Sequence, residues 1–478
     1  MKSTNKAKIL IILLCLTLVI QVTGCGETIV ADNFTEEETT DETSEIVPEV
    51  EKRDFGGRTF RMLTRTKADT IHPNLNTDEL TAETINDAIY YRNRKLENDY
   101  NITFTEHLNT EPSGIARASI LANSDDFEMI TMRCIFSYQL AAEGLSYPVD
   151  ELENINLDRP YWYSSINEAL TLFGRQYFAA GAFNLTSYDF THMLLFNKRV
   201  AEDFLIPNLY EKVENGEWTY DLFAKYVSMV SGDVNGDSKL DENDRWGYLA
   251  NGKQVPPCFW ISAGVLSIAK DENDEPVIAY DSERFADVFT RIFEITRDTG
   301  AWYYNTDPED VPPSSIRIFS ADNALFMDCT FFFIEYLRNM ESDFGILPYP
   351  KWDNNQEKYI SRIEGCDLFI VPITAQDTDY VSLILEALAA ESEKSVIPQY
   401  YEVALKGKYS RDDESATMLD LIFNNRVFDF GDTIWCQHIR DGVFASMYMN
   451  DMRNIASRSA ALNRVVNKLI QEAAEKFS

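Results

Sequence analysis

The chain has 478 residues and is strongly acidic, with 43 Lys and Arg against 78 Asp and Glu and a net charge of −35. Residues 1–24 hold three Lys and no acid, so without them 40 basic and 78 acidic residues remain and the net charge is −38. This charge argues against nucleic-acid binding, which needs basic surface to neutralise phosphates, and against peripheral binding to an anionic membrane. We expect a soluble extracellular protein.

The first 25 residues indicate export. Three Lys in the first eight residues precede an apolar run from Ile9 to Ile20, which is shorter than the roughly 20 residues of a membrane-spanning helix. A basic start, a short apolar stretch and a small-residue processing site are typical of a secretory signal. The motif Val22-Thr23-Gly24-Cys25 resembles the bacterial lipobox, whose Cys is lipidated. We expect a lipoprotein signal peptide at 1–24 and an acyl chain such as palmitate on Cys25. A plain signal peptide or an uncleaved anchor is the alternative.

A polar segment follows the expected lipidation site. From Glu27 to Glu51 there are ten acidic residues and no Lys or Arg. Such a segment cannot bury enough apolar surface to offset its ordering entropy, and its charges repel one another. We expect residues 25–54 to be a disordered tether and residues 55–478 to form the folded body. This body is long enough for two domains.

Apolar periodicity in the body predicts α/β structure. Arg58–Thr64 alternates as a strand, Thr84–Tyr100 places Ile85, Ile89 and Leu96 at helical spacing, and Asn101–Leu108 returns to period two. A strand, a helix and a strand at this spacing predict a βαβ unit and a parallel sheet. Further elements are expected as a strand at Phe127–Met132, a helix capped by Asp379 that runs to Ala390, and a last helix at about Ile455–Phe477.

Seven Cys are present. Cys15 lies in the signal and Cys25 is the expected lipid site. The other five are an odd number at wide spacing, with no CxxC or metal spacing: Cys134, Cys258, Cys329, Cys366 and Cys436. We expect these five to be buried free thiols rather than a disulfide framework.

One acidic loop has the ligand spacing of an EF-hand calcium site. Oxygen ligands stand at positions 1, 3, 5 and 9, a carboxylate at position 12, and a backbone carbonyl is available at position 7. In order, these residues are Asp233, Asn235, Asp237, Asp241, Asp244 and Lys239. Position 6, usually Gly, is Ser238, and Glu242 could supply the last ligand in place of Asp244. We expect a structural calcium ion; an acidic solvated turn is the alternative.

Several blocks of the chain resemble extracellular solute-binding proteins of ABC importers, the family 1 group that includes maltose-binding-type sugar receptors. The likeness runs from about Phe55 to Trp435 and depends on the order and spacing of the blocks. They are Phe196-Asn197-Lys198, Gly216–Asp221, Ala324-Leu325-Phe326, Phe344–Pro350, Val371-Pro372-Ile373 and Val396–Tyr401. Oligosaccharide-binding relatives have similar calcium loops, and there the ligands match Asp233, Asn235, Asp237, Lys239, Asp241 and Glu242.

The resemblance implies a two-lobed, type 2 periplasmic-binding-protein-like α/β fold with discontinuous lobes that close by hinge motion. Lobe 1 would comprise about 55–188 and 320–368, and lobe 2 about 192–318 and 372–478. Crossovers would then fall near Tyr188–Thr191, Ile318–Ser320 and Leu368–Val371. It also implies a lipid-anchored protein on the outer face of the cell membrane, which works as a monomer and delivers a carbohydrate to ABC permease subunits.

Ligand-binding residues are expected beyond the carboxyl ends of strands, where sites lie in open α/β sheets. Sugars need aromatic faces for their C–H surfaces and polar side chains for their hydroxyls. The candidates are Thr64, Arg65, Arg133, Tyr188, Asp189, Trp260, Trp302, Asp328, Phe331 and Trp435. For any one Trp or Tyr, core packing is the alternative.

Two other classes of function are the alternatives to a binding protein. A glycoside hydrolase would need two carboxylates about 5–10 Å apart, and with 78 acids a sequence pair proves nothing. No GxSxG or HExxH motif is present, and the four His are not paired at ligand spacing. A calcium-dependent adhesion or scaffold module would resemble a dockerin, but those carry two such loops and this chain has one. We expect a binding protein and not an enzyme.

Overall fold

The computed structural model describes residues 50–66, 74–299, 302–303, 313–402 and 412–478. The expected signal peptide at 1–24, the lipidation site Cys25 and most of the tether at 25–54 lie outside the described residues. Within the described part of the chain, no helix is long and apolar enough to cross a bilayer.

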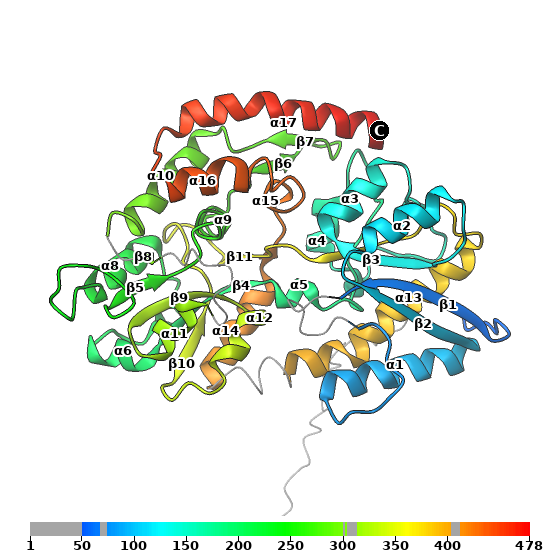
Figure 1. Cartoon of the computed structure of the whole chain (residues 1–478), viewed down its shortest axis with the longest axis horizontal. Helices are drawn as coiled ribbons and strands as arrows, with labels where there is room; N and C mark the ends of the chain where they lie inside the picture. The colour runs from blue at the N-terminus through cyan, green and yellow to red at the C-terminus, as the bar shows by residue number, and fades with distance from the viewer. Residues whose placement is uncertain (1–49, 67–73, 300–301, 304–312, 403–411) are drawn as a thin grey trace, which may run out of the picture. The chain divides into compact units, whose positions relative to one another are not determined.

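The first sheet confirms the expected βαβ unit (Figure 1). Its order is β12-β3-β1-β2, with three parallel strands and an antiparallel edge strand, β12. The strands are β1 (Arg58–Arg65), β2 (Ile102–Asn109), β3 (Met129–Arg133) and β12 (Asp367–Ile370). Between β1 and β2, α1 (Thr84–Tyr100) buries Ile85, Ile89 and Leu96 and ends where Asn101 adopts a left-handed φ of 49°. The apolar spacing therefore predicted both bounds of this helix.

The second sheet has five strands in the order β10-β4-β9-β5-β8. β4 is antiparallel to both β10 and β9, whereas β9, β5 and β8 run parallel. All six residues of β4 are buried, because strands flank it on both sides and helices cover the sheet. The strands are β4 (His192–Asn197), β5 (Trp246–Leu249), β8 (Trp302–Tyr303), β9 (Ala324–Thr330) and β10 (Phe344–Leu347).

Two small sheets complete the strands. β11 (Ser361–Arg362) runs parallel to β13 (Arg426–Val427), and β6 (Ile268–Lys270) runs antiparallel to β7 (Pro276–Ile278). The two larger sheets and these two ribbons account for all thirteen named strands of the described residues. The fold is therefore α/β with two main sheets, as the sequence predicted.

Helices pack on each large sheet. Those that contact the first sheet or its helices are α1, α2 (Pro112–Leu121), α3 (Cys134–Ala142) and α13 (Thr378–Ser395). Those that contact the second sheet or its helices are α6 (Lys198–Asp203), α7 (Leu209–Glu214), α8 (Tyr220–Val230), α9 (Val255–Ser262), α10 (Glu283–Ile295), α11 (Ser314–Ser320), α12 (Phe331–Ile334), α14 (Asp413–Asn424) and α16 (Ala445–Met449). The other α-helices are α4 (Ser164–Leu170), α5 (Thr186–Asp189), α15 (Phe430–Thr433) and α17 (Ile455–Phe477), of which α17 contacts helices of both groups.

Short helices of other types also join these elements. They include the 3₁₀ helices η1 (Val149–Glu151), η2 (Pro160–Trp162) and η3 (Glu335–Leu337), and the π-helix η5 (Arg440–Phe444). The last helix, α17, has the expected bounds and contacts α3, α10 and β7.

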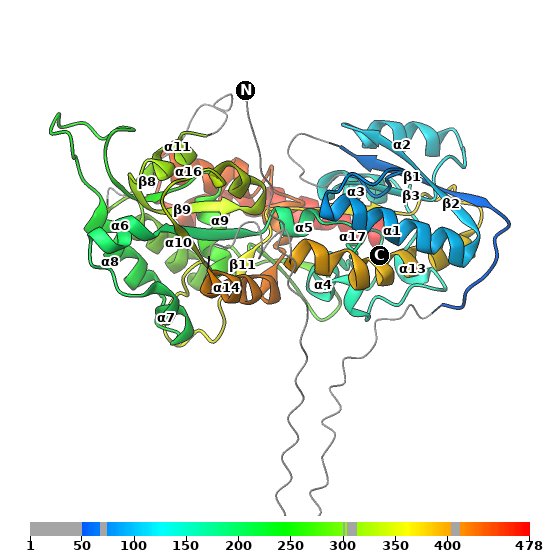
Figure 2. The same cartoon turned by 90° about the horizontal axis from the view of Figure 1, so that it is seen from below.

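The expected division into lobes needs correction in two places. Segment 320–368 was assigned to lobe 1, but β9 and β10 are hydrogen-bonded neighbours of β4 in the second sheet. Segment 372–478 was assigned to lobe 2, but α13 packs against α1 (Figure 2). Strand pairing and helix docking are long-range contacts, which local periodicity does not encode. The start of α13 is also corrected, because Asp377 and not Asp379 accepts the capping hydrogen bond, from the Tyr380 N–H.

The crossovers follow from these contacts. The chain enters the second sheet between α5 and β4, which confirms the expected crossover at Tyr188–Thr191. Ile318–Ser320 is not a crossover, because it is the end of α11, which packs on β9. The passage back to the first sheet lies between β11 and β12, before the expected Leu368–Val371.

The five Cys of the folded body are free and buried, as predicted. Apolar burial raises the pKa of the Cys134 thiol to about 12, so these groups behave as small core residues.

We predict that Gly247→Ala destabilises the second sheet. A Cβ at Gly247 would overlap the backbone of Val227 in α8, and backbone cannot move aside as a flexible side chain can. The expected loss is at least about 2 kcal/mol of unfolding free energy, measured by denaturant titration.

Gly114→Ala is the matched control. Gly114 lies inside α2 and an added Cβ meets nothing within 4 Å, so this variant should gain roughly 0.5–1 kcal/mol from helix propensity. Equal stability of the two variants would contradict the close approach of β5 and α8.

Candidate functional site

The carboxyl ends of β1 and β3 bring three expected ligand-binding residues to one edge of the first sheet. Thr64 lies opposite Thr131 in the parallel register. Thr64 and Arg65 are buried, and Arg65 Nε donates to both carboxylate oxygens of Asp367 at 2.8 and 2.9 Å. Arg133 is exposed. Of the three, Arg133 presents an exposed positive charge, whereas the charge of Arg65 is buried and paired with Asp367.

Tyr188 and Asp189 are packing residues at the first crossover and not open polar groups. Both are buried. The Tyr400 hydroxyl donates to Asp189 Oδ1 at 2.6 Å. The Tyr188 ring packs 5.0 Å from the Phe423 ring, and the Arg426 guanidinium lies 4.1 Å from its centroid. These contacts join α5 to segments far away in the sequence.

Trp260 is a core residue, which corrects the expectation that it lines a ligand site. Its side chain is fully buried, and its ring lies 5.8 Å from the Phe444 ring. Its indole N–H donates to Asp429 Oδ2 at 2.9 Å. Burial, followed by the charge of Asp432, raises the pKa of Asp429 to about 6 despite hydrogen bonds from Ser267 and Trp260.

Two more aromatic candidates are also buried. Phe331 stacks on Phe423 at 5.0 Å, and Trp435 packs edge-on against Phe430 at 4.9 Å. Burying large aromatic rings stabilises a core strongly, so the packing alternative holds for both. The backbone of Trp302 pairs with Tyr248, and its side chain lies outside the described residues.

Exposed aromatic rings instead follow Phe331 directly. Phe333 is 37% exposed and Tyr336 is 41% exposed, with their rings stacked at a centroid distance of 6.3 Å. They lie on α12 and η3, at the carboxyl end of β9. The run Phe331-Phe332-Phe333 could have predicted an exposed aromatic ring from the sequence, because three successive helical residues cannot all face the core.

Tyr336 lines a surface cavity of about 470 Å³. This volume is within the usual range of ligand pockets. Asp322, in its wall, accepts hydrogen bonds from Ser342 Oγ at 2.7 Å and Arg199 Nη1 at 3.0 Å. The lining residues are Ser320, Ala321, Asp322, Tyr336, Asn339, Met340, Glu341 and Ser342. An aromatic face and several polar groups thus meet at one hollow.

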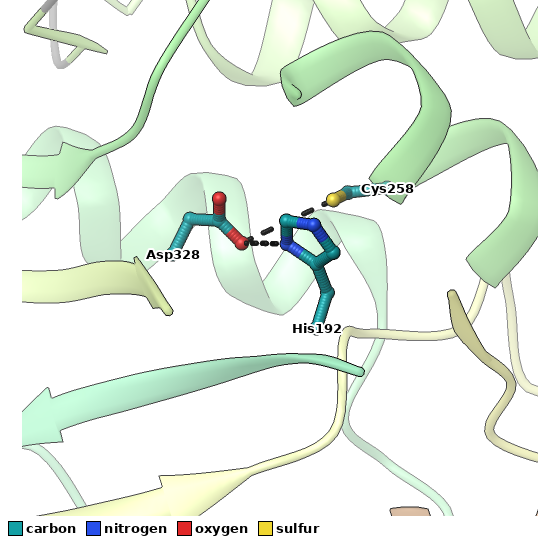
Figure 3. Close-up of side chains that lie close together, drawn as sticks. All are labelled: His192, Cys258 and Asp328. Carbon is teal, nitrogen blue, oxygen red and sulfur yellow. Dashed lines mark hydrogen bonds and ion pairs between the residues drawn. The ribbon is translucent and has the colours of Figure 1, made fainter. Parts of the chain in front are cut away.

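A buried polar cluster surrounds Asp328, the remaining candidate. The His192 ring and the Cys258 thiol both point toward its carboxylate (Figure 3). Asp328 Oδ1 lies 2.8 Å from His192 Nδ1, 2.6 Å from the Tyr349 hydroxyl that donates to it, and 3.9 Å from Cys258 Sγ. Burial and the nearby Arg362 lower the pKa of His192, but Asp328 and Cys258 together raise it well above its usual range.

Arg362 closes this cluster from β11. Its Nε and Nη2 donate to the two carboxylate oxygens of Asp432 at 2.6 and 3.0 Å, and both side chains are fully buried. Arg362 Nη1 donates to Gln254 Oε1 at 2.6 Å and lies 2.9 Å from His192 Nε2. Gln254 in turn donates to Glu364 at 2.6 Å. Burial raises the pKa of Glu364, but His192 and Arg362 outweigh it and hold this pKa below its ordinary range.

His192, Cys258 and Asp328 could in principle hold a metal ion, since their ligand atoms lie within 4.8 Å of one another. The donor set fits poorly, however. Tyr349 already donates to Asp328, and the Arg362 guanidinium lies 3.7 Å from Cys258 Sγ. A cation placed beside this buried guanidinium would be repelled. We interpret the cluster as a hydrogen-bond network.

The acidic loop folds around its own carboxylates. Asp233 accepts hydrogen bonds from the backbone of Gly236 and Ser238, and Asp237 accepts one from Lys239. Asn235 likewise accepts from Asp237.

Asp244 is better placed than Glu242 to act as the last acidic ligand of the loop. Asp244 is buried and accepts from the backbone N–H groups of Val234 and Asp241 at 3.1 and 2.9 Å. Glu242 instead reaches Arg317 at 3.4 Å. The donor types and the inward carboxylates fit a hard cation. Ser238, where Gly is usual, adopts a φ of 65°.

Comparison with known proteins gives a fold but no sequence family. No protein-family model and no curated protein matches the chain. Solved structures match over most of its length. A Listeria monocytogenes ABC substrate-binding protein in complex with cycloalternan has a TM-score of 0.53 at 9% identity, covering 86% of this chain and 99% of its own.

Two further structures agree. A Thermotoga lettingae ABC transporter solute-binding protein, bound with α-D-tagatose, has a TM-score of 0.52 at 13% identity, covering 87% of this chain and all of its own. The cyclic α-maltosyl-1,6-maltose binding protein of Arthrobacter globiformis has a TM-score of 0.57 at 12% identity, covering 87% and 99%. The chain therefore has the two-lobed α/β fold of ABC-importer solute-binding proteins.

Proposed function

We propose that this protein is the extracellular substrate-binding component of an ABC importer and that it captures a sugar or oligosaccharide for the permease. The observation that carries the proposal is the fold match over 86–87% of the chain to proteins whose names state sugar ligands. It works as a monomer and not as an enzyme.

The proposed sugar contacts are exposed groups at the carboxyl ends of strands. Phe333 and Tyr336 follow β9 and provide stacked aromatic faces, and Arg133 follows β3. Aromatic faces cover the C–H surface of a sugar, and polar side chains bind its hydroxyls. The buried rings of Trp260, Phe331 and Trp435 would support this site through the core.

We expect sugars to raise the melting temperature of the protein in a thermal-shift screen of mono- and oligosaccharides. With the best sugar, Phe333→Ala and Tyr336→Ala should each weaken binding about tenfold, since buried aromatic anchors contribute more than about 1 kcal/mol.

Tyr91→Ala is the control for the aromatic variants, because Tyr91 is 60% exposed on α1, and it should bind normally. Stabilisation by peptides or amino acids alone would refute the sugar assignment. Conversion of the sugar into product would refute the binding role.

The proposed membrane anchor is a lipid on Cys25. On a cell without an outer membrane, a receptor that has no anchor would be lost by diffusion. A single acyl chain contributes reversible membrane affinity. The acidic residues from Glu27 to Glu51 would form an extended tether between the lipid and the body.

Cys25→Ala should move the protein from the membrane fraction to the culture medium, measured by fractionation and mass spectrometry of the N-terminus. Conversion of Thr28 to Ala, three residues on, is the control and should leave the protein in the membrane fraction. Membrane retention of Cys25→Ala would contradict lipid anchoring.

Calcium is the proposed structural ion of the Asp233–Asp244 loop. Asp233, Asn235, Asp237, Asp241 and Asp244 would supply side-chain oxygens and Lys239 a carbonyl, and the ion would offset the repulsion of these acids. An extracellular site of this type can be as weak as about 10⁻⁴–10⁻³ M and still fill.

Calorimetric titration of the chelator-treated protein should show calcium binding and a higher melting temperature. Ser238→Gly should raise the melting temperature both with and without calcium, because Gly removes roughly 1 kcal/mol of left-handed backbone strain that is already present without the ion. The control is Ser231→Gly, which lies before the loop and has no left-handed φ. No heat and no melting shift on adding calcium would rule out the ion.

A further inference from the structure

His192 stands where two passages between the sheets meet. It is the first residue of β4, directly after the crossover from α5. The preceding residue, Thr191, forms an antiparallel bridge with Ile363, and the Glu364 N–H donates to the Phe190 carbonyl at 3.0 Å. Glu364 belongs to the segment that leads from β11 to β12. The two crossovers therefore run side by side at His192.

The two ring nitrogens of His192 have different surroundings. Nδ1 lies 2.8 Å from Asp328 Oδ1 and donates to this carboxylate. Nε2 lies between a donor and an acceptor, with Arg362 Nη1 at 2.9 Å and Glu364 Oε2 at 3.4 Å. A guanidinium can only donate, so Nε2 accepts from Arg362 when the ring is neutral. When the ring is protonated, Nε2 must donate, and Glu364 is the carboxylate within reach.

We propose that His192 is a proton switch at these two paired crossovers. When Nε2 is protonated, its hydrogen-bond partner changes from Arg362 to Glu364. The new contact links β4 to the segment that enters β12. Protonation forms a charge-assisted contact across the Thr191–Ile363 bridge. Deprotonation leaves Arg362 as the partner, and Arg362 is already held by Asp432 and Gln254.

The charges around the ring favour the protonated form. From the elements packed against His192, the titratable groups are Asp328 on β9, Cys258 on α9, Arg362 on β11 and Glu364 beyond it. Arg362 is paired with Asp432, which Arg440 also contacts at 3.4 Å, and Asp328 and Glu364 are the carboxylates within reach of the imidazolium. His192 is 2% exposed, so these interactions are weakly screened by water.

The direction of the pH effect follows from the raised pKa of His192. Stability from the protonated ring is fully present below the unfolded-state value of about 6.5. It is lost as the pH rises through the higher folded-state pKa. Low pH therefore stabilises the contact between the two crossover segments, and high pH weakens this contact. Since hinge segments carry lobe closure, ligand affinity would then depend on pH, a consequence that rests on the proposed function.

The test is NMR of the full mature chain with ¹⁵N-labelled His, in which the four His are assigned by single variants. We expect Nδ1 of His192 to stay protonated throughout, while Nε2 changes from protonated to unprotonated well above pH 6.5. Glu364→Gln keeps the shape but removes the charge, so it should lower the proton affinity of His192 at least about tenfold.

Hydrogen exchange at residues 186–197 and 361–370 gives the structural readout. Corrected for intrinsic rates, protection should fall in wild type as His192 deprotonates, and the pH dependence should shift down in Glu364→Gln. His438→Asn is the control, because His438 is exposed, and it should leave both readouts unchanged.

An Nε2 titration near pH 6.5 that Glu364→Gln does not move would overturn the proposal, as would pH-independent protection of both segments. Neither readout needs a ligand. If the sugar screen fails while the titration behaves as expected, the switch stands and the sugar-binding role is refuted.

Discussion

The buried ion pair between Arg362 and Asp432 is the interaction on which the arrangement of this protein depends. Both side chains are fully buried and joined by two hydrogen bonds. A buried charge is costly unless it is paired and hydrogen-bonded. Arg362 therefore requires that β11, α15 and the start of α9 lie together in the folded protein. Removing Asp432 would leave an uncompensated cation in the interior.

This ion pair also explains the position of His192. Once Asp432 and Gln254 occupy most of the Arg362 donors, the imidazole lies between the remaining N–H and the Glu364 carboxylate. On its other side, Asp328 and Tyr349 fix the ring through Nδ1. A titratable ring is thus held in one orientation with only one nitrogen free to change its partner. The dense network that fits a metal ion poorly is the same network that surrounds the ring with groups that respond to its protonation.

Local elements followed from the sequence because their causes are local. In α1, the spacing of Ile85, Ile89 and Leu96 predicted both helix bounds, and the alternation in β1 and β2 predicted a parallel pair. The ligand spacing of the acidic loop predicted a compact turn with inward carboxylates, although it could not choose between Asp244 and Glu242. The different surroundings of the two acids depend on the tertiary structure, since Glu242 contacts Arg317, which is distant in sequence. The aromatic candidates failed for a related reason, because burial of Trp260 or Phe331 is decided by what packs on it.

The sequence by itself determined an acidic α/β protein with a βαβ unit, five buried thiols and an acidic loop, because composition and periodicity act over a few residues. Only the tertiary structure decided that β9 and β10 join β4, that α13 returns to α1, and that Phe333 and Tyr336 rather than Phe331 face solvent. It also decided that His192, Asp328, Arg362 and Glu364 meet. Each of these features depends on contacts between segments that are far apart in the sequence. Bringing such segments together costs loop-closure entropy, and this cost is offset by apolar burial in the complete fold rather than by any one segment.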